Sequence, residues 1–323
     1  MKQLRAHAVC GGLVIACVLA ILSLILVDAG GQTPPALFWH ILLNLQLPLI
    51  CTALLVGAAL AVSSASLQVV LNNPLADPGI IGISSGASLV AAIMLLVVPA
   101  HYSTGSLAVL PAACFGGALL STWLIYLLAR RLRGATTAVI LAGIAISTLS
   151  SALMAWLFVF ADAQAMRNLT FWLMGSLYQT NWSILAVAGP IMLFTLIALC
   201  HLAPRLNWLY GGSRLTAAAG VSPARLNKQV LIISALGVGA AVSVAGSIAF
   251  VGLLVPHFMR LLIGYDNRRL LPACALAGAL VLLLVAVINE YSHQIALPVS
   301  MITATVGGPL LLWALYRGQW KLA

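Results

Sequence analysis

AVCGGLVIACVLAILSLILV, residues 8–27, is a continuous apolar run that contains no charged residue. A helix that crosses the hydrocarbon core of a bilayer needs about 20 such residues. Strands of a membrane barrel alternate between apolar and polar side chains, and this run does not. The run is also too long for the apolar core of a signal peptide, and no small-residue cleavage pattern follows it. It therefore predicts a first membrane-spanning helix.

The rest of the chain has the same character. Of its 323 residues, 63% are hydrophobic and only 6% are charged, and its mean hydropathy is +1.13. A soluble domain carries about 25% charged residues, so this chain cannot cover itself with a solvated surface. In lipid the backbone must satisfy its own hydrogen bonds, which continuous apolar runs do as helices. The composition thus predicts an all-α polytopic membrane protein.

The apolar runs predict about ten transmembrane helices within a single transmembrane domain that spans residues 1–323. They fall near residues 8–27, 48–71, 80–98, 107–128, 139–160, 184–202, 230–250, 256–263, 271–288 and 299–316. A weak internal repeat is also visible, because Gly57-Ala58-Ala59 recurs as Gly239-Ala240-Ala241. The two copies fall in helices expected to run in opposite directions, which is typical of an inverted repeat.

Basic residues predict the topology. The net charge is +10, and most Lys and Arg cluster in a few short segments, at 2–5, 130–133, 205–228, 268–269 and 317–321. The positive-inside rule makes these segments cytoplasmic and puts both termini in the cytoplasm. Arg167 alone falls on the expected outer side. Basic runs interleaved with aromatic residues are absent, so nucleic-acid binding is not expected.

The sequence argues against several functional classes. The five acidic residues all fall at predicted helix ends or loops, which disfavours a proton-coupled carrier or a charge-selective channel. No phosphate-binding loop motif occurs, so the chain is not expected to bind ATP, and no catalytic constellation stands out. The six cysteines lie in apolar runs without a CxxC pair, which is typical of helix packing rather than of a metal site or disulfide.

Several ordered strings carry a resemblance to a known family. QVVLNNPLADPGIIG at residues 68–82, followed by Ser85-Gly86-Ala87, closely resembles a signature of the FecCD permease family. The strings AGSIAFVGLLVPH at 245–257, Leu141-Ala142-Gly143, WLMGSL at 172–177 and TATVGGP at 303–309 match in the same order. The match covers nearly the whole chain.

The resemblance implies the permease subunit of an ABC importer in the bacterial inner membrane, with a vitamin B12 importer-like fold. Its ligand would be an iron–siderophore, haem or cobalamin, with siderophores the commonest in the family. The implied partners are a second permease copy or a paralogue, two ATPase subunits that hold ATP and Mg, a periplasmic binding protein, and lipid. The permease itself would be neither an enzyme nor a cofactor protein. Two alternatives stay open: a secondary carrier or channel, and a non-transporting scaffold.

The resemblance and the residues together predict an ATPase-coupling segment at about residues 204–228. Its charge makes it cytoplasmic, and its small residues permit close approach of a partner helix. The coupling residues expected are Gly211, Gly212, Ser213, Arg214, Ala218, Gly220 and Val221.

A cytoplasmic gate is expected where two turns, residues 72–78 and 134–137, flank the helices that would line the path. The residues expected to narrow it are Asn73, Leu75, Thr136 and Thr137. His257 follows Pro256 at the expected start of a short helix, where Pro presets the first turn, so a structural role is expected for it.

The chain departs from the family at the outer face. The family carries arginines there that are thought to pair with glutamates of the binding protein, whereas this chain has Gln46 and Leu49 at one such position. Arg167 and Glu290 would then be its main outer charges, so the expected docking residues are Gln46, Leu49, Arg167 and Glu290. Docking is expected either to be weaker and less salt-sensitive than usual or to rely on an arginine-bearing partner permease.

Overall fold

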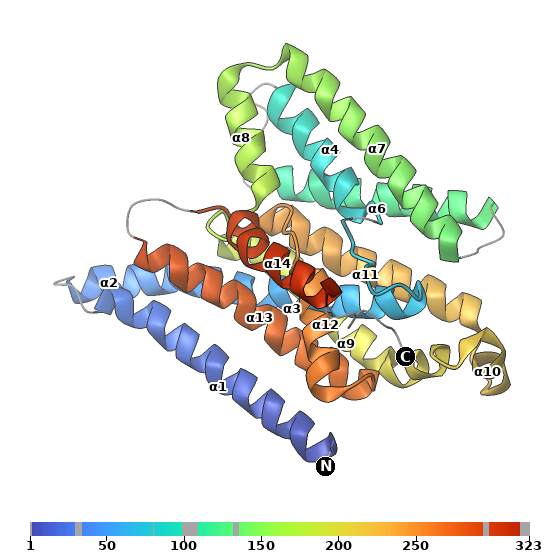
Figure 1. Ribbon diagram of the computed structural model, residues 1–323. Coiled ribbons are helices and arrows are strands. Elements are labelled where there is room, and N and C mark those ends of the chain that lie inside the picture. Colours follow the sequence, from blue (N-terminus) through green and yellow to red (C-terminus); the bar gives the residue numbers. More distant parts are fainter. Residues whose placement is uncertain are drawn as a thin grey trace.

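The computed structural model describes residues 2–29, 34–79, 81–98, 109–131, 136–292 and 297–316. Within these ranges every regular element is a helix (Figure 1), which confirms the predicted all-α class. The elements are α1 (Lys2–Ala29), α2 (Pro35–Ile41), the π-helix η1 (Leu42–Gln46), α3 (Leu47–Val70), α4 (Ile83–Leu96), α6 (Val109–Arg131), α7 (Thr136–Phe160), α8 (Ala163–Met174), α9 (Trp182–Leu209), α10 (Gly212–Ala218), α11 (Pro223–Ala245), α12 (Val251–Ile263), α13 (Asn267–Tyr291) and α14 (Val299–Tyr316).

Helix α3 lies at the centre of the molecule. It packs against α9, α11, α12 and α13, and nearly all of its side chains are buried. A helix that is apolar on every side must be covered by lipid or by other helices, and here other helices cover it. The closest approach is at Gly57, where a β-carbon would lie 2.2 Å from the carbonyl oxygen of Gly278 on α13. Small residues permit such backbone contact between membrane helices, and dispersion then holds the pair.

A second group of helices, α4, α6, α7 and α8, lies in the upper part of Figure 1. Helix α4 packs against the other three, and α6 also contacts α11 of the central group. The crossing of α4 and α6 is again set by glycine, because a β-carbon at Gly86 would lie 2.3 Å from the carbonyl oxygen of Gly117. Two groups of helices therefore meet mainly along α6 and α11.

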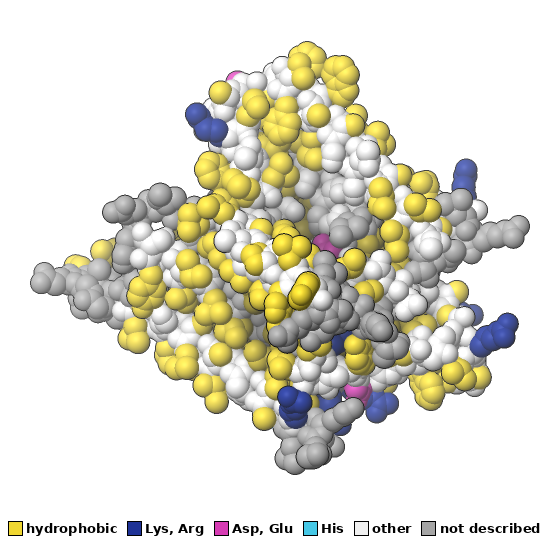
Figure 2. Space-filling model, in the orientation of Figure 1, with side chains coloured by type: hydrophobic (Ala, Val, Ile, Leu, Met, Phe, Trp, Pro, Cys, Tyr) yellow, Lys and Arg dark blue, Asp and Glu magenta, His cyan; other side chains and the backbone are white. Residues whose placement is uncertain are grey.

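The outer surface of the helices suits a bilayer. Among the residues that the structure describes, seven helices are long and apolar enough to cross a membrane, and three shorter apolar helices lie at 83–96, 251–263 and 299–313. Figure 2 shows hydrophobic side chains spread over one face, with most Lys and Arg side chains along its lower and right margins. The number of helices that actually cross, about ten by sequence, stays a prediction, as does the inverted repeat.

Several helices differ from those expected. The second span begins at Pro35 rather than after Pro48, because the π-helical turn η1 lets the helix continue through that proline. Helix α8, which was not expected, begins where the carboxylate of Asp162 accepts the backbone N–H groups of Gln164 and Ala165. The seventh span ends at Ala245 instead of Phe250, and α12 then begins at Val251.

The expectation that Pro256 starts a helix is therefore wrong. Pro256 lies inside α12, and His257 is buried in that helix with its ring against Phe258, at 5.6 Å between ring centroids. The expected helix start at Pro256 is therefore not found. The buried position of His257 within α12 is compatible with the structural role expected for it.

Candidate functional site

The turn between α3 and α4 contains the expected gate residues Asn73 and Leu75. Asn72 adopts a left-handed conformation with φ 45°, which reverses the chain directly after α3. The side-chain oxygen of Asn73 then accepts the backbone N–H of Leu75 at 2.9 Å. This local turn leaves the Leu75 side chain 42% exposed, so an apolar group projects from a rigid turn.

The same turn is anchored through Asp77. Its carboxylate accepts the backbone N–H of Gly79 at 2.9 Å and lies against the first turn of α12. A β-carbon at Gly252 would lie 2.6 Å from the Asp77 carboxylate and 2.1 Å from Oγ of Ser64, so only glycine fits there. Burial raises the pKa of Asp77 to about 6. The turn is thus packed into the protein rather than free at its surface.

The second expected gate segment begins α7. Thr136 is the first residue of this helix and Thr137 is exposed, whereas Gly134 lies outside the described residues. Helix α7 is hydrogen-bonded to α4, which follows the turn that contains Asn73 and Leu75. Oγ of Ser85 on α4 donates to Oγ of Ser147 on α7 at 2.9 Å. Gly143 also touches the backbone of Ile81, where a β-carbon would lie 2.2 Å from the carbonyl oxygen. These contacts pack α7 against the residues at the start of α4, which follow the first turn.

A buried cation behind the turn was not anticipated. Arg260, in the last turn of α12, is only 6% exposed. Its guanidinium donates to the side-chain oxygen of Gln68, and at 3.4 Å to the carbonyl oxygen of Ala65. Both residues lie on α3, and Gln68 also donates to the carbonyl oxygen of Gly252 at 3.4 Å. A charge buried this deeply must be hydrogen-bonded, so Arg260 ties α12 to the end of α3 that precedes the turn.

The expected coupling segment forms a helix–turn–helix unit at the right of Figure 1. Helix α10 follows α9 through Gly211 and leads through Gly220 into α11. Gly212 and Gly220 have φ +86° and +76°, and a β-carbon at either would meet no atom within 4 Å. The expected residues 211–214, 218 and 220 are exposed and Val221 is half-buried, so most of the segment is available to a partner.

One buried hydroxyl links α10 to the end of α9. Oγ1 of Thr216 donates a bond shared between the carbonyl oxygens of Trp208 and Gly212, at 2.9 and 2.8 Å. At the base, the side chain of Asn207 donates to Asp266 at 2.7 Å and accepts the backbone N–H of Asn267 at 2.9 Å. The segment is therefore joined by hydrogen bonds to the start of α13.

The expected docking residues do not form one exposed surface in this chain. Gln46 and Leu49 are each only 6% exposed, because neighbouring helices surround them. They line a cavity of about 200 Å³ together with Tyr178 and Glu290. The Tyr178 hydroxyl donates to the Glu290 carboxylate at 3.4 Å, and burial, with the Glu290 charge, raises the pKa of Tyr178. Arg167 does not line this cavity and lies exposed on α8, where it bonds Gln164.

Within the described residues, no three His, Cys, Asp or Glu side chains gather to hold a metal ion. The site consists of packed turns, small residues and one buried cation, which suits a passage better than a reaction centre.

Comparison with known proteins agrees with this arrangement. Residues 8–317 match the model of the FecCD transport family. The hemin transport system permease protein HmuU of Yersinia pestis is 41% identical over 283 residues, which cover 86% of this chain and 84% of that protein. The vitamin B12 import system permease protein BtuC of Vibrio cholerae is 39% identical over 282 residues, covering 85% and 82%. A solved structure of a metal-chelate type ABC transporter in an inward-facing conformation is 31% identical with a TM-score of 0.86, covering 96% of this chain and 99% of that one.

Proposed function

The chain belongs to the FecCD transport family of ABC importer permeases, and from this membership we propose that it moves a large metal chelate inward across the bacterial inner membrane. The observation that carries the proposal is the family match over residues 8–317. The ligand would be haem, cobalamin or an iron–siderophore. The resemblance alone favoured siderophores, because they are the commonest ligands of the family. The relatives are named for hemin and vitamin B12, so we propose the whole class of haem, cobalamin and iron–siderophores.

Two ATPase subunits would drive transport by docking on the coupling segment, and ATP and Mg would bind to those subunits. The exposed α10 and the open space around Gly212 and Gly220 support this role. Its hydrogen bonds to the start of α13 would transmit the ATPase movement to the helices of the path.

A second permease copy or a paralogue would complete the path. Helices α7 and α14 expose large apolar side chains, among them Trp156 at 67%, Val159 at 71% and Leu312 at 69%. A partner permease would cover part of this surface and lipid the rest. The segments with Asn73, Leu75, Thr136 and Thr137 would then meet their counterparts at the inner mouth, and both termini would be cytoplasmic.

A periplasmic binding protein would deliver the ligand to the outer face. This chain offers the Glu290 carboxylate there, while Gln46 and Leu49 are buried beside it. Docking would therefore be weak and little affected by salt, or an arginine-bearing partner permease would provide the main contacts.

The decisive experiment is reconstitution of this chain with its ATPase and binding protein in vesicles, with uptake measured with and without ATP. We expect uptake only when ATP and all three components are present, since the chain itself carries no nucleotide site. Competition among haem, cobalamin and ferric siderophores then identifies the ligand. ATP-independent uptake would favour a secondary carrier, and ligand binding without uptake would favour a scaffold.

A further inference from the structure

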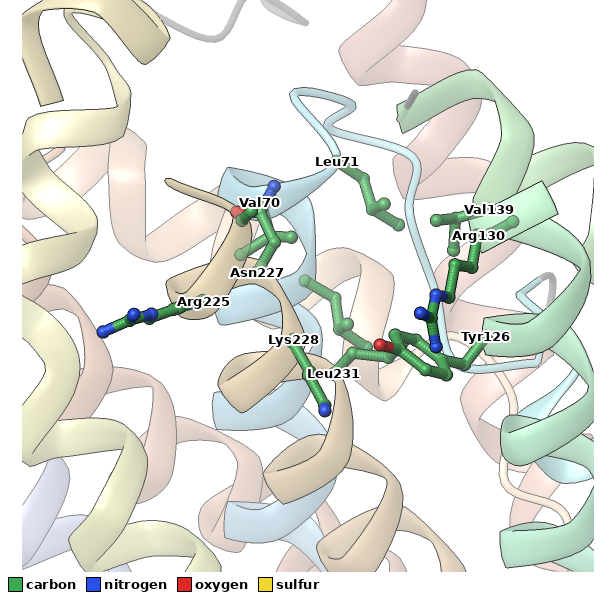
Figure 3. Close-up of a pocket in the computed structure, with 12 residues that line it drawn as sticks. Val70, Leu71, Tyr126, Arg130, Val139, Arg225, Asn227, Lys228 and Leu231 are labelled. Carbon is green, nitrogen blue, oxygen red and sulfur yellow. The ribbon is translucent and has the colours of Figure 1, made fainter. Parts of the chain in front are cut away.

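A second cavity, of about 370 Å³, lies between the two groups of helices, apart from the outer one. Its walls come from α3, α6, α7 and α11 (Figure 3). The lining residues are Leu67, Val70, Leu71, Tyr126, Ala129, Arg130, Val139, Ala224, Arg225, Asn227, Lys228 and Leu231. It lies where α6 ends, α7 begins and α11 begins, at the level of the basic segments that the positive-inside rule makes cytoplasmic.

The charge around this cavity is entirely positive. Of the 12 residues that line it, Arg130, Arg225 and Lys228 are cationic and none is acidic. The Lys228 ammonium lies 5.4 Å from the centroid of the Tyr126 ring. In Figure 3, Lys228 on α11 and Arg130 on α6 lie on either side of the cavity near Tyr126, while Arg225 points away. Two cations facing one space without a carboxylate repel each other, and an anion between them would remove that repulsion.

The remainder of the lining is apolar. Leu67, Val70 and Leu71 at the end of α3, with Leu231 and Val139, provide aliphatic side chains beside the cations. Val139 is half-buried, and Val70 and Leu231 keep a small exposed fraction, so these three side chains can touch a ligand. A free phosphate would use only the cations, whereas a molecule with a phosphate at one end and acyl chains at the other would use both parts.

We propose that this cavity is a binding site for an anionic phospholipid of the cytoplasmic leaflet, such as phosphatidylglycerol. Its phosphate lies between Arg130 and Lys228, and its acyl chain lies against Val70, Val139 and Leu231. Basic pockets between membrane helices on the cytoplasmic side are typical sites for anionic headgroups. The lipid bridges α6 of one helix group and α11 of the other, and α11 begins within the coupling segment, so an anionic lipid strengthens the contact between the two groups.

The test is native mass spectrometry of the full chain titrated with phosphatidylglycerol or phosphatidylcholine. The wild-type chain is expected to retain phosphatidylglycerol in preference. The double variant R130Q/K228Q is expected to lose roughly fivefold in affinity per cation, hence about 25-fold for phosphatidylglycerol, with phosphatidylcholine unchanged. Arg268→Gln removes an exposed cation from the same face outside the cavity and is expected to change neither affinity.

A filling variant covers the case in which the double variant does not fold. Ala224 is exposed and lines the cavity, so Ala224→Trp is expected to abolish the preference while leaving both cations in place. Equal retention of the two lipids by the wild type would overturn the proposal. So would displacement of the lipid by millimolar inorganic phosphate, which would make the ligand a soluble anion. Loss of ATPase co-purification with unchanged lipid retention in R130Q/K228Q would assign the cations to a protein surface instead.

Discussion

Replacing Gly220 with Trp tests whether the coupling segment is a docking surface. Gly220 has φ +76°, a conformation that costs a residue with a side chain about 1–2 kcal/mol. A β-carbon there would meet no atom within 4 Å, and Gly220 is exposed, so the indole can extend away from the rest of this chain. The isolated variant should therefore fold with only a small loss of stability, and any larger effect must arise when a partner approaches.

The assay measures ATP hydrolysis and ligand uptake together in vesicles that contain the complete transporter. We expect uptake by Gly220→Trp to fall at least tenfold while ATP hydrolysis loses its response to the ligand-loaded binding protein, because the ring occupies the contact surface. Gly264→Trp is the matched control, since Gly264 has φ +89°, is equally open, and lies between α12 and α13 outside the segment. Normal uptake by Gly220→Trp, or an equal loss in Gly264→Trp, would refute the assignment.

Three further predictions concern the gate, the core and the buried acid. Cysteines at Thr137 of two protomers should crosslink to an extent that changes with nucleotide; crosslinking that ignores nucleotide would count against a gate. Gly278→Ala should lower the free energy of unfolding by about 3 kcal/mol in detergent melts, because its β-carbon would lie 2.2 Å from the Gly57 carbonyl oxygen, whereas Gly116→Ala on α6, which meets nothing within 4 Å, should not. The pKa of Asp77 is about 6 in the folded chain and has its ordinary, lower value in the unfolded chain. The free energy of unfolding should therefore fall by about 2 kcal/mol as pH rises from 4 to 6 and then level off. Asp77→Asn should remove this slope, and an unchanged slope would show that another group is responsible.

The apolar runs predicted the helices well because length and continuity alone identify a segment that lipid must cover. Helix α8 was missed because its residues are mixed in polarity, although Asp162 directly before it is a typical helix-start signal. Pro48 was taken as a helix start, but the stronger signal was Pro35 at the first position of α2.

The site itself was only partly predictable. Asn73 and Leu75 could be named from a motif, and the turn chemistry of Asn73 explains their geometry. The contact of Asp77 with Gly252, and the bond between Arg260 and Gln68, join residues far apart in the chain. No local pattern encodes such pairs, because they arise only when α12 packs against α3. The burial of Gln46 and Leu49 likewise follows from helices that surround them, which a linear motif does not describe.

The complete enclosure of α3 has a consequence for biosynthesis. Helix α3 is among the first segments to leave the ribosome, yet its neighbours α9, α11 and α13 are among the last. Roughly 220 residues separate the end of α3 from the end of α13, which at about 5–20 residues per second takes on the order of ten to forty seconds. Until α13 has been synthesised, Gly57 and the surface of α3 around it face lipid or the insertion machinery instead of Gly278. The nascent chain therefore passes through a stage in which α3, the central helix of the finished protein, still lies at its lipid-facing surface.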